Sequence, residues 1–150
     1  RLQTALALAK RHQGKLALVF VDLDQFKPVN DLHGHAVGDL LLQEVARRME
    51  ATVRASDTVG RIGGDEFVVV LTELAGPEEA MLVAEKIRRA LAAPYEINGK
   101  TLTIACSAGV VLYPDHGGND IELMARADAA MYAAKIGGRN QVRLYQPEKP

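Results

Sequence analysis

Two glycines followed by two carboxylic acids stand between two runs of apolar, β-prone residues near the middle of the chain. The motif comprises Gly63, Gly64, Asp65, Glu66 and Phe67. A glycine pair between such runs predicts a tight β-hairpin, because glycine adopts the positive φ angles that these turns require. Carboxylates at a hairpin tip are fixed by the backbone yet open to a ligand, which favours metal binding over core packing, where an unpaired charge is costly. Taken alone, the five residues also fit a solvated turn that happens to carry acids.

A second pair of acids, Asp22 and Asp24, follows the continuous apolar run 16–21. This run is short and rich in β-prone residues, so it predicts a central strand that is buried on both faces. If this strand lies beside the hairpin, Asp22 and Asp65 meet at one edge of the sheet. Mg²⁺ prefers one or two carboxylates plus water and substrate phosphates, and the Leu23 carbonyl would add an oxygen ligand. By itself the spacing of Asp22 and Asp24 is a weak signal and favours an acidic strand end exposed to water.

Three cations accompany the acids along the chain. Lys27 follows the second acidic pair closely, whereas Lys135 and Arg139 lie at and just beyond the end of the last predicted helix. Cations gathered near a metal site suit a polyphosphate ligand. The alternative for Lys135 is a charge that complements a helix C-terminus.

Asn30 and Asp39 are able to recognise a nucleobase. An aspartate that accepts hydrogen bonds from N1–H and the 2-amino group favours guanine over adenine, which lacks both donors. The alternatives are turn chemistry for Asn30 and a first-turn helix acid for Asp39.

Composition sets the class of protein. A chain of 150 residues with 48% hydrophobic and 25% charged residues is expected to form one soluble domain with an adequate core. The net charge of −1 indicates neither a nucleic-acid partner nor a membrane surface. We find no signal peptide and no run that would span a membrane, and we expect a cytoplasmic domain. Cys106 is the only cysteine, which excludes an intramolecular disulfide and a multi-cysteine zinc site and fits a small buried hydrophobe.

Hydrophobic periodicity predicts an alternation of helices and strands that fits a split β-α-β arrangement on a largely antiparallel sheet, with helices packed on one face. Residues 25–31 are expected to form a turn or loop, because Pro28 disfavours helix at Lys27. The predicted helices are 1–13, about 35–54, 77–93 and 120–136, and the predicted strands are 16–21, 57–63, 66–72, 95–97, 101–103, 105–112 and 141–145.

Together these motifs resemble the GGDEF domains, the diguanylate cyclase family. The similarity runs from about residue 15 to 145 and includes several motifs in the family's order. They are the signature 63–67, a D-x-D-x-F-K-x-x-N-D stretch at 22–31, a G-H-x-x-G-D stretch that ends at Asp39, and a closing motif at 127–140. The family's D-x-L-T-G-L-x-N-R stretch would lie before residue 1, so we expect residues 1–150 to be a single catalytic domain cut from a longer multidomain signalling protein.

The resemblance implies an α/β (α+β) palm-type fold, with a ferredoxin-like core as in adenylyl cyclases and polymerases. It implies that two GTP condense into cyclic di-GMP, with one GTP and two Mg²⁺ (or Mn²⁺) per domain in an antiparallel homodimer. It assigns metal binding to Asp22, the Leu23 carbonyl and Asp65. Glu66 is expected either to be a further metal ligand or to act on the 3′-hydroxyl of GTP. In the substrate site, the resemblance implies that guanine is recognised by Asn30 and Asp39. The triphosphate is expected to be lined by Phe26, Lys27, Lys135 and Arg139, with Gly63 and Gly64 at the signature turn.

A further match suggests feedback inhibition. Arg54 and Asp57 have the spacing of the family's R-x-x-D site, which binds product away from the active site. Lys86 stands where a second arginine often completes that site, and lysine lacks the bidentate, stacked contact of arginine, so we expect weaker inhibition. The alternative is a helix-end arginine and a turn aspartate.

Other functions remain open at this point. The first is a catalytically silent module that only binds GTP or cyclic di-GMP. Such a module would stand beside a sensory or phosphodiesterase domain in a longer protein, and a membrane anchor in that longer protein is compatible with this function. An intact signature argues against it. The second is another nucleotidyl transferase of palm fold, which the guanine-reading pair disfavours. A purely structural domain leaves the coincidence of motifs unexplained.

Overall fold

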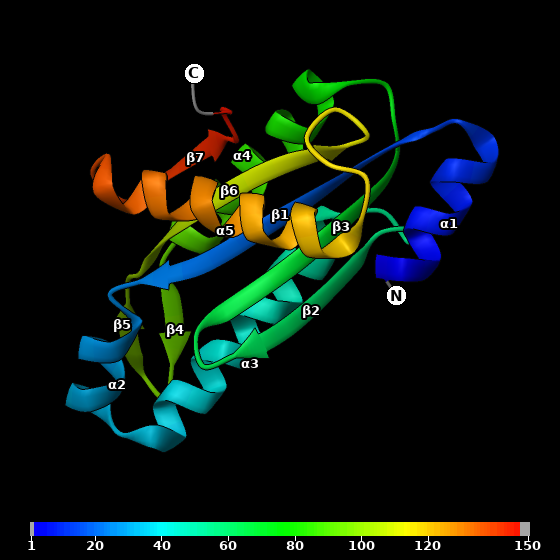
Figure 1. Ribbon diagram of the computed structural model, residues 1–150. Coiled ribbons are helices and arrows are strands. Elements are labelled where there is room, and N and C mark those ends of the chain that lie inside the picture. The colour runs from blue at the N-terminus through cyan, green and yellow to red at the C-terminus, as the bar shows by residue number, and fades with distance from the viewer. Residues whose placement is uncertain (1, 148–150) are drawn as a thin grey trace.

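A computed structural model describes residues 2–147, which form a five-stranded sheet, a separate two-stranded hairpin and flanking helices (Figure 1). The helices are α1 (Leu2–His12), α2 (Phe26–His33), α3 (His35–Thr52), α4 (Pro77–Ala92) and α5 (Asp120–Ile136). The strands are β1 (Lys15–Asp24), β2 (Thr58–Gly63), β3 (Glu66–Leu74), β4 (Tyr95–Ile97), β5 (Lys100–Leu102), β6 (Ala105–Tyr113) and β7 (Gln141–Leu144).

Strand β1 lies at the centre of the large sheet, whose order is β2-β3-β1-β6-β7. It pairs antiparallel with β3 and with β6, and the only parallel pair within residues 2–147 is β6 with β7. The predicted split β-α-β fold on a mostly antiparallel sheet is therefore confirmed. The predicted neighbourhood of the first strand and the 57–72 hairpin is confirmed as well.

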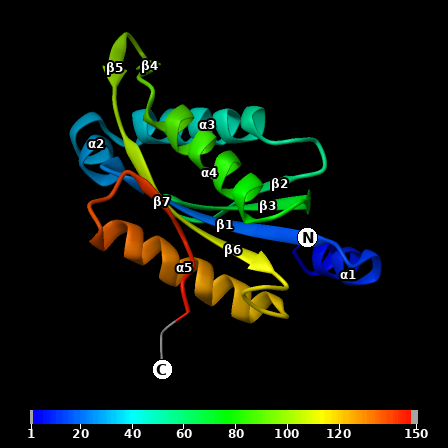
Figure 2. The ribbon, with the colours of Figure 1, turned by 90° about the horizontal axis from the view of Figure 1, so that it is seen from above.

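Helices cover both faces of the sheet, so the expectation that they pack on one face was wrong. Figure 2 shows α3 and α4 on one side and α5 on the other. Successive side chains of a strand point to opposite faces. In β1, Val19 and Val21 accordingly join the core beneath α3 and α4, whereas Leu18 and Phe20 join the core beneath α5. A strand that is apolar on both faces needs a helical cover on each.

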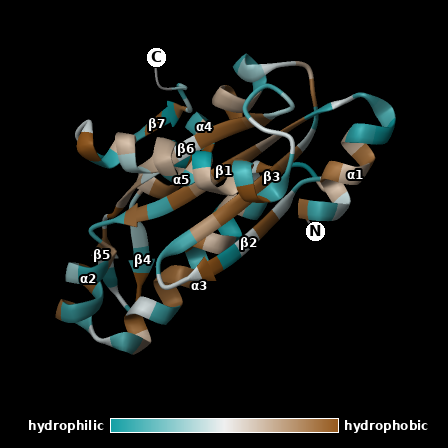
Figure 3. Ribbon diagram, in the orientation of Figure 1, coloured by the Kyte–Doolittle hydropathy of each residue, from teal (hydrophilic) through white to brown (hydrophobic). Residues whose placement is uncertain are grey.

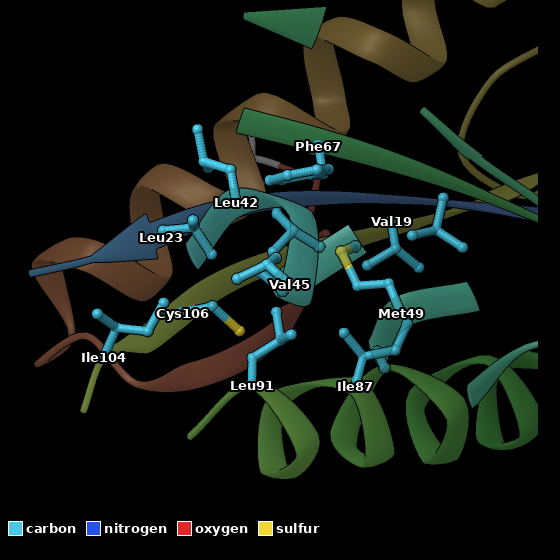
Figure 4. Close-up of a cluster of buried hydrophobic side chains, with 14 of the residues drawn as sticks. Val19, Leu23, Leu42, Val45, Met49, Phe67, Ile87, Leu91, Ile104 and Cys106 are labelled. Atoms are coloured by element: carbon cyan, nitrogen blue, oxygen red, sulfur yellow. The ribbon is translucent and has the colours of Figure 1, made fainter. Parts of the chain in front are cut away.

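The larger core lies between the sheet and helices α3 and α4. Figure 4 shows Met49 of α3 and Ile87 and Leu91 of α4 directed towards the strands, together with Cys106 of β6. Cys106 is fully buried, as predicted, and burial raises the pKa of its thiol to about 12. Figure 3 shows hydrophobic residues concentrated along β1, β3 and β6, while α2 is mainly hydrophilic.

The opposite face depends on one glycine. A Cβ atom at Gly109 of β6 would collide with backbone atoms of Ala127 and Met131 in α5. Because glycine has no side chain, the helix backbone lies close against the strand. This contact fixes the depth at which α5 crosses the sheet, and it helps to place the end of α5 near the end of β1.

The segment after β1 is a helix rather than the predicted loop. Pro28 is the third residue of α2, where a backbone N–H has no partner within the helix in any case. The first backbone hydrogen bond of this turn runs from Val29 N to Gln25 O at 3.3 Å. Proline therefore removes no helical hydrogen bond here, and its fixed φ suits the first turn.

None of the helices between residues 2 and 147 has the length and hydrophobicity that a membrane crossing requires.

Candidate active site

The end of β1 and the tip of the β2–β3 hairpin form the centre of the candidate site. Asp22 lies opposite Glu66 in the antiparallel register, and the Leu23 amide donates a hydrogen bond of 3.1 Å to the Asp65 carbonyl. In an extended strand the N–H and C=O of one residue point to the same side. The Leu23 carbonyl oxygen therefore also faces the hairpin. The structure thus brings together the four residues that the sequence assigned to metal binding.

The hairpin tip is open. Gly64 and Asp65 form the two-residue turn, and Gly64 has a φ of +34°, as expected for a glycine turn. A Cβ atom at Gly63 or Gly64 would meet no atom within 4 Å. Packing therefore does not require a glycine at position 63, and the tip leaves space for a ligand to approach the backbone.

Acidic groups at this end of the sheet repel one another. Burial, followed by the charge of Asp65, raises the pKa of Asp22 to about 6. The ammonium group of Lys135 opposes the shift, and Glu66 adds a smaller increase. A group whose charged form is disfavoured in this way is stabilised by a further cation.

The acidic set is too small to enclose a metal by itself. No group of three or more His, Cys, Asp or Glu side chains within residues 2–147 is arranged to hold a metal ion. Mg²⁺ usually keeps several waters and binds one or two carboxylates together with substrate phosphates. The residues present fit that kind of site better than a protein-only metal cage.

Lys135 links the acids to α5. Its Nζ atom lies 3.3 Å from Asp22 Oδ2 and 3.5 Å from Asp24 Oδ1. Arg139, in the turn after α5, lies with Nη1 3.7 Å from Asp24 Oδ1 and keeps about half of its side chain exposed. Figure 1 shows the end of α5 and the start of β7 near the arrowhead of β1. Of the predicted phosphate ligands, Lys135 therefore lies beside the predicted metal ligand Asp22, and Arg139 lies beside Asp24, two residues further along β1.

Asp24 belongs to this site as well, although the sequence identified it only as the second acid of a pair and predicted no role for it. Its carboxylate is only 3% exposed and accepts hydrogen bonds from Ser107 Oγ and from the Asn140 amide. These partners lie 83 and 116 residues away in the chain. The only local signal was its place two residues after Asp22.

The predicted base-reading residues lie on α2 and α3. A side chain at Gly38 would collide with the amide of Asn30, so the glycine lets the two helices approach at this point. The Asn30 amide also lies 3.4 Å from His35 Nδ1. Asp39 is exposed next to Gly38, and it lines a cavity of about 330 Å³ between α3 and β2. The structure therefore brings Asn30 close to the helix turn that carries Asp39.

Phe26 and Lys27 occupy the first two positions of α2. Phe26 is partly buried against the larger core, whereas Lys27 is exposed. This helix begins directly after the acids of β1, so Lys27 lies at the same end of the sheet as Asp22.

The predicted inhibitory motif lies near the other end of the hairpin. Asp57 Oδ1 accepts from Thr72 N at 3.0 Å, and Oδ2 accepts from Arg54 N at 3.0 Å. Only 3% of the Asp57 side chain is exposed, whereas 52% of the Arg54 side chain is exposed. Asp57 therefore fixes the loop between α3 and β2, and Arg54 is the accessible member of the pair. Lys86 is exposed on α4, and no hydrogen bond or ion pair among residues 2–147 joins it to Arg54 or Asp57.

A split antiparallel sheet with carboxylates at the end of its central strand and on the adjoining hairpin defines a palm-type cyclase domain. The family model described as "Diguanylate cyclase, GGDEF domain" matches residues 1–141, so the chain belongs to the GGDEF family of diguanylate cyclases.

Relatives and solved structures agree with this assignment. The chain is 49% identical over 140 residues to the bifunctional diguanylate cyclase/cyclic di-GMP phosphodiesterase MucR of Pseudomonas aeruginosa, covering 93% of this chain and 20% of MucR. It is 40% identical to the diguanylate cyclase TpbB of the same species, covering 100% of this chain and 35% of TpbB.

The crystal structure of the TpbB GGDEF domain matches with a TM-score of 0.95 over 99% of this chain and 92% of that one, at 40% identity. The GGDEF domain of DgcB from Caulobacter crescentus, solved in complex with c-di-GMP, matches with a TM-score of 0.86 at 30% identity, over 97% of this chain and 86% of that one. The chain thus spans between a fifth and about a third of the length of these curated relatives.

Proposed function

We propose that this domain condenses two molecules of GTP into cyclic di-GMP and releases pyrophosphate, in a homodimer whose two half-sites face each other in antiparallel fashion. The supporting observation is the convergence of Asp22, Asp65 and Lys135 at one end of the sheet. Each domain would hold one GTP. The 3′-hydroxyl of one nucleotide then attacks the α-phosphorus of the other, a phosphoester bond forms and pyrophosphate leaves. A second transfer in the opposite sense closes the ring.

In this proposal the acids hold divalent cations, two Mg²⁺ or Mn²⁺ per site. Asp22, Asp65 and the Leu23 carbonyl oxygen are the ligands, because they face one another and because burial, followed by the charge of Asp65, raises the pKa of Asp22, so that a cation beside it would favour its charged form. When bound, the cations offset the charge that develops on the transferred phosphoryl group. Glu66, beside Asp22 in the register, either ligates a cation or accepts the proton of the 3′-hydroxyl.

The remaining residues would orient the nucleotide. Lys135 and Arg139 bind phosphate oxygens, and Phe26 and Lys27 border the same space from α2. The open backbone at Gly63 and Gly64 permits close approach of the triphosphate. Asn30 and Asp39 read the guanine edge, with Asp39 accepting from N1–H and the 2-amino group. In phosphoryl transfer, such positioning supplies much of the rate enhancement.

We also propose feedback inhibition by product at Arg54, Asp57 and Lys86. The guanidinium of Arg54 contacts the Thr72 carbonyl and Asp57, and its half-exposed side offers donors to a guanine edge or a phosphate. The buried Asp57 holds the loop that presents it. Lys86 offers a single charge where an arginine would provide a planar fork, so affinity is lower than at a two-arginine site.

A second candidate function is a regulatory module that binds GTP or cyclic di-GMP without turnover. It is favoured by similarity to proteins named as phosphodiesterases, such as NbdA of Pseudomonas aeruginosa at 40% identity over 136 residues. In either case we propose that the domain acts in the cytoplasm, where GTP is available, within a longer protein carrying sensory or phosphodiesterase domains.

The test is product analysis at several protein concentrations. The domain is incubated with GTP and Mg²⁺, and the nucleotides are identified by mass spectrometry. We expect cyclic di-GMP, formed at a rate per domain that rises with protein concentration because two half-sites must meet. Binding of GTP, or of added cyclic di-GMP, without formation of product would support the regulatory module. If the domain binds neither nucleotide and forms no product, both functions are contradicted.

A further inference from the structure

The geometry points to Asp24 as a positioning residue for the nucleotide site. We infer that its buried carboxylate fixes the turn between α5 and β7, residues 137–140, so that Lys135 and Arg139 face the substrate phosphates. The inference rests on the proposed function, because it assigns those two cations to the triphosphate.

Asp24 is enclosed by protein and cannot itself contact a ligand. It is 3% exposed, and Ser107, its hydrogen-bond partner, is 0% exposed. The Ser107 hydroxyl lies 3.0 Å from each carboxylate oxygen. A buried carboxylate is costly unless hydrogen-bond donors surround it. Any effect of Asp24 on substrate must therefore pass through the groups that it holds.

One of those groups is the backbone of the turn after α5. The backbone N–H of Asn140 donates a hydrogen bond to Asp24 Oδ2 at 2.9 Å. Arg139 and Asn140 have φ angles of 61° and 48°, in the left-handed region that residues with side chains rarely adopt. Two such residues in succession persist only where surrounding contacts hold them. The hydrogen bond to Asp24 is one such contact, and it determines the direction in which Arg139 leaves the backbone.

The other groups are the cations themselves. Asp24 Oδ1 lies 3.5 Å from Lys135 Nζ and 3.7 Å from Arg139 Nη1. Lys135 is shared with Asp22, the predicted metal ligand. Arg139 is more exposed, so its guanidinium has room to contact a phosphate while remaining near Asp24. The carboxylate thereby keeps both cations in place before substrate arrives, which lowers the cost of ordering them on binding.

Arg88 of α4 holds the same turn from its other side. Its Nη1 donates to Asn140 Oδ1 at 2.9 Å, and its Nε donates to Glu85 Oε2 at 3.1 Å. Asn140 is therefore fixed through its backbone by β1 and through its side chain by α4. If the turn matters for phosphate binding, loss of either contact has the same kind of effect.

The experiment measures affinity for a non-hydrolysable GTP analogue and for guanosine, which lacks phosphates. The variants are Asp24→Asn, Arg88→Gln, Arg139→Ala and the double variant Asp24→Asn/Arg139→Ala. Arg89→Gln is the matched control, because Arg89 is exposed on the same helix and makes no hydrogen bond or ion pair within residues 2–147. We expect Asp24→Asn to weaken analogue binding by about tenfold or more, the size of loss that follows removal of a residue that orients a metal ligand. Arg88→Gln should also weaken binding of the analogue. In both variants the affinity for guanosine should be unchanged, and Arg89→Gln should change neither affinity.

The double variant tests whether Asp24 acts through Arg139. Residues in one network are not additive, so Asp24→Asn should cost much less in the Arg139→Ala background than in the wild type. Wild-type analogue affinity in Asp24→Asn and Arg88→Gln would overturn the inference, as would an equal loss for analogue and guanosine, which indicates general damage to the fold. If Asp24→Asn does not fold, Ser107→Ala and Arg88→Gln carry the same test. If the wild type binds neither analogue nor guanosine, the proposed function itself fails, which is a distinguishable result.

Discussion

The amide of Leu23 donates a hydrogen bond to the carbonyl oxygen of Asp65, at 3.1 Å. This bond joins the last part of the central strand to the hairpin turn, although the two residues are far apart in the chain. Asp22 precedes the donor residue and Asp65 carries the acceptor, so the separation of the two aspartates along the backbone is set by the geometry of the sheet. Rigid placement of charged groups is what electrostatic stabilisation of a transition state requires.

The first prediction concerns Asp65. Asp65→Asn keeps the shape of the side chain but removes its charge, so metal binding and phosphoryl transfer should both weaken. We expect cyclase activity to fall on the order of 10²-fold or more, while the circular dichroism spectrum and the melting temperature stay close to those of the wild type. Glu78→Gln, the same kind of change at an exposed position of α4, should leave activity intact. Near-normal turnover in a well-folded Asp65→Asn protein would refute the metal assignment.

The second prediction concerns base recognition by Asp39. An acceptor that the bound base shields from water and leaves without a donor costs about 1–3 kcal/mol, so the wild type should prefer GTP to ATP. Inosine triphosphate retains N1–H but lacks the 2-amino group, and it should bind with intermediate affinity. In Asp39→Ala the affinities for the three nucleotides should become more similar. They are measured by competition of each nucleotide with one fluorescent GTP analogue. If Asp39→Ala discriminates among them as well as the wild type does, the base pocket lies elsewhere.

Sequence reasoning reached the arrangement of β1 and the hairpin because both signals are local. The apolar run 16–21 is short and rich in β-prone residues, which indicated a buried strand, and the glycines indicated the turn. The one-face expectation failed although this run was predicted to be buried on both faces, which already required two helical covers. The predicted loop at residues 25–31 was wrong because proline is tolerated in the first turn of a helix, and Pro28 lies there. Asp24 could not be assigned, since its partners Ser107 and Asn140 reach it only through the tertiary fold.

The third prediction tests the close contact between α5 and β6. In Gly109→Ala, the added methyl group meets backbone atoms of α5 that cannot move aside easily. We expect the free energy of unfolding, measured by urea denaturation, to fall by about 1–3 kcal/mol. Gly60→Ala in β2 is the control, because a Cβ atom there meets nothing within 4 Å. Equal stability of the two variants would contradict the described position of α5.

The fourth prediction is a pH dependence of stability at His116. Its Nδ1 accepts a hydrogen bond of 3.0 Å from Leu112 N, which requires that nitrogen to be unprotonated. Burial, aided by the charge of Arg126 and opposed by Asp115, lowers the pKa of His116 below its ordinary value. The unfolded chain therefore binds the proton more readily, so the histidine's contribution is present above a pH of about 6.5 and is lost as the pH falls below that value.

His116→Gln provides the comparison, because glutamine offers an acceptor oxygen but does not titrate. The stability advantage of the wild type over this variant should shrink between pH 8 and pH 5 in thermal melts. Since all other ionisable groups are common to both proteins, their titrations cancel in the difference. Parallel pH curves for the two proteins would show that His116 does not change protonation on unfolding.

The last prediction concerns product binding at Arg54. The guanidinium of Arg54 is about half exposed, whereas Asp57 is buried and accepts hydrogen bonds from the backbone amides of Arg54 and Thr72. Arg54→Ala therefore keeps both of these backbone bonds and removes only the contacts of the guanidinium with the Thr72 carbonyl and the Asp57 carboxylate. Calorimetry with cyclic di-GMP should show loss of a binding site in Arg54→Ala. Lys86→Arg should bind equally or more tightly, because arginine supplies a bidentate fork where lysine supplies one charge. Arg89→Ala, on the same helix as Lys86, serves as the control and should match the wild type. In kinetic assays the same order of affinities should appear as noncompetitive inhibition that is weak in the wild type and stronger in Lys86→Arg. Unchanged binding in Arg54→Ala would exclude this site and would leave the active site as the place where product binds.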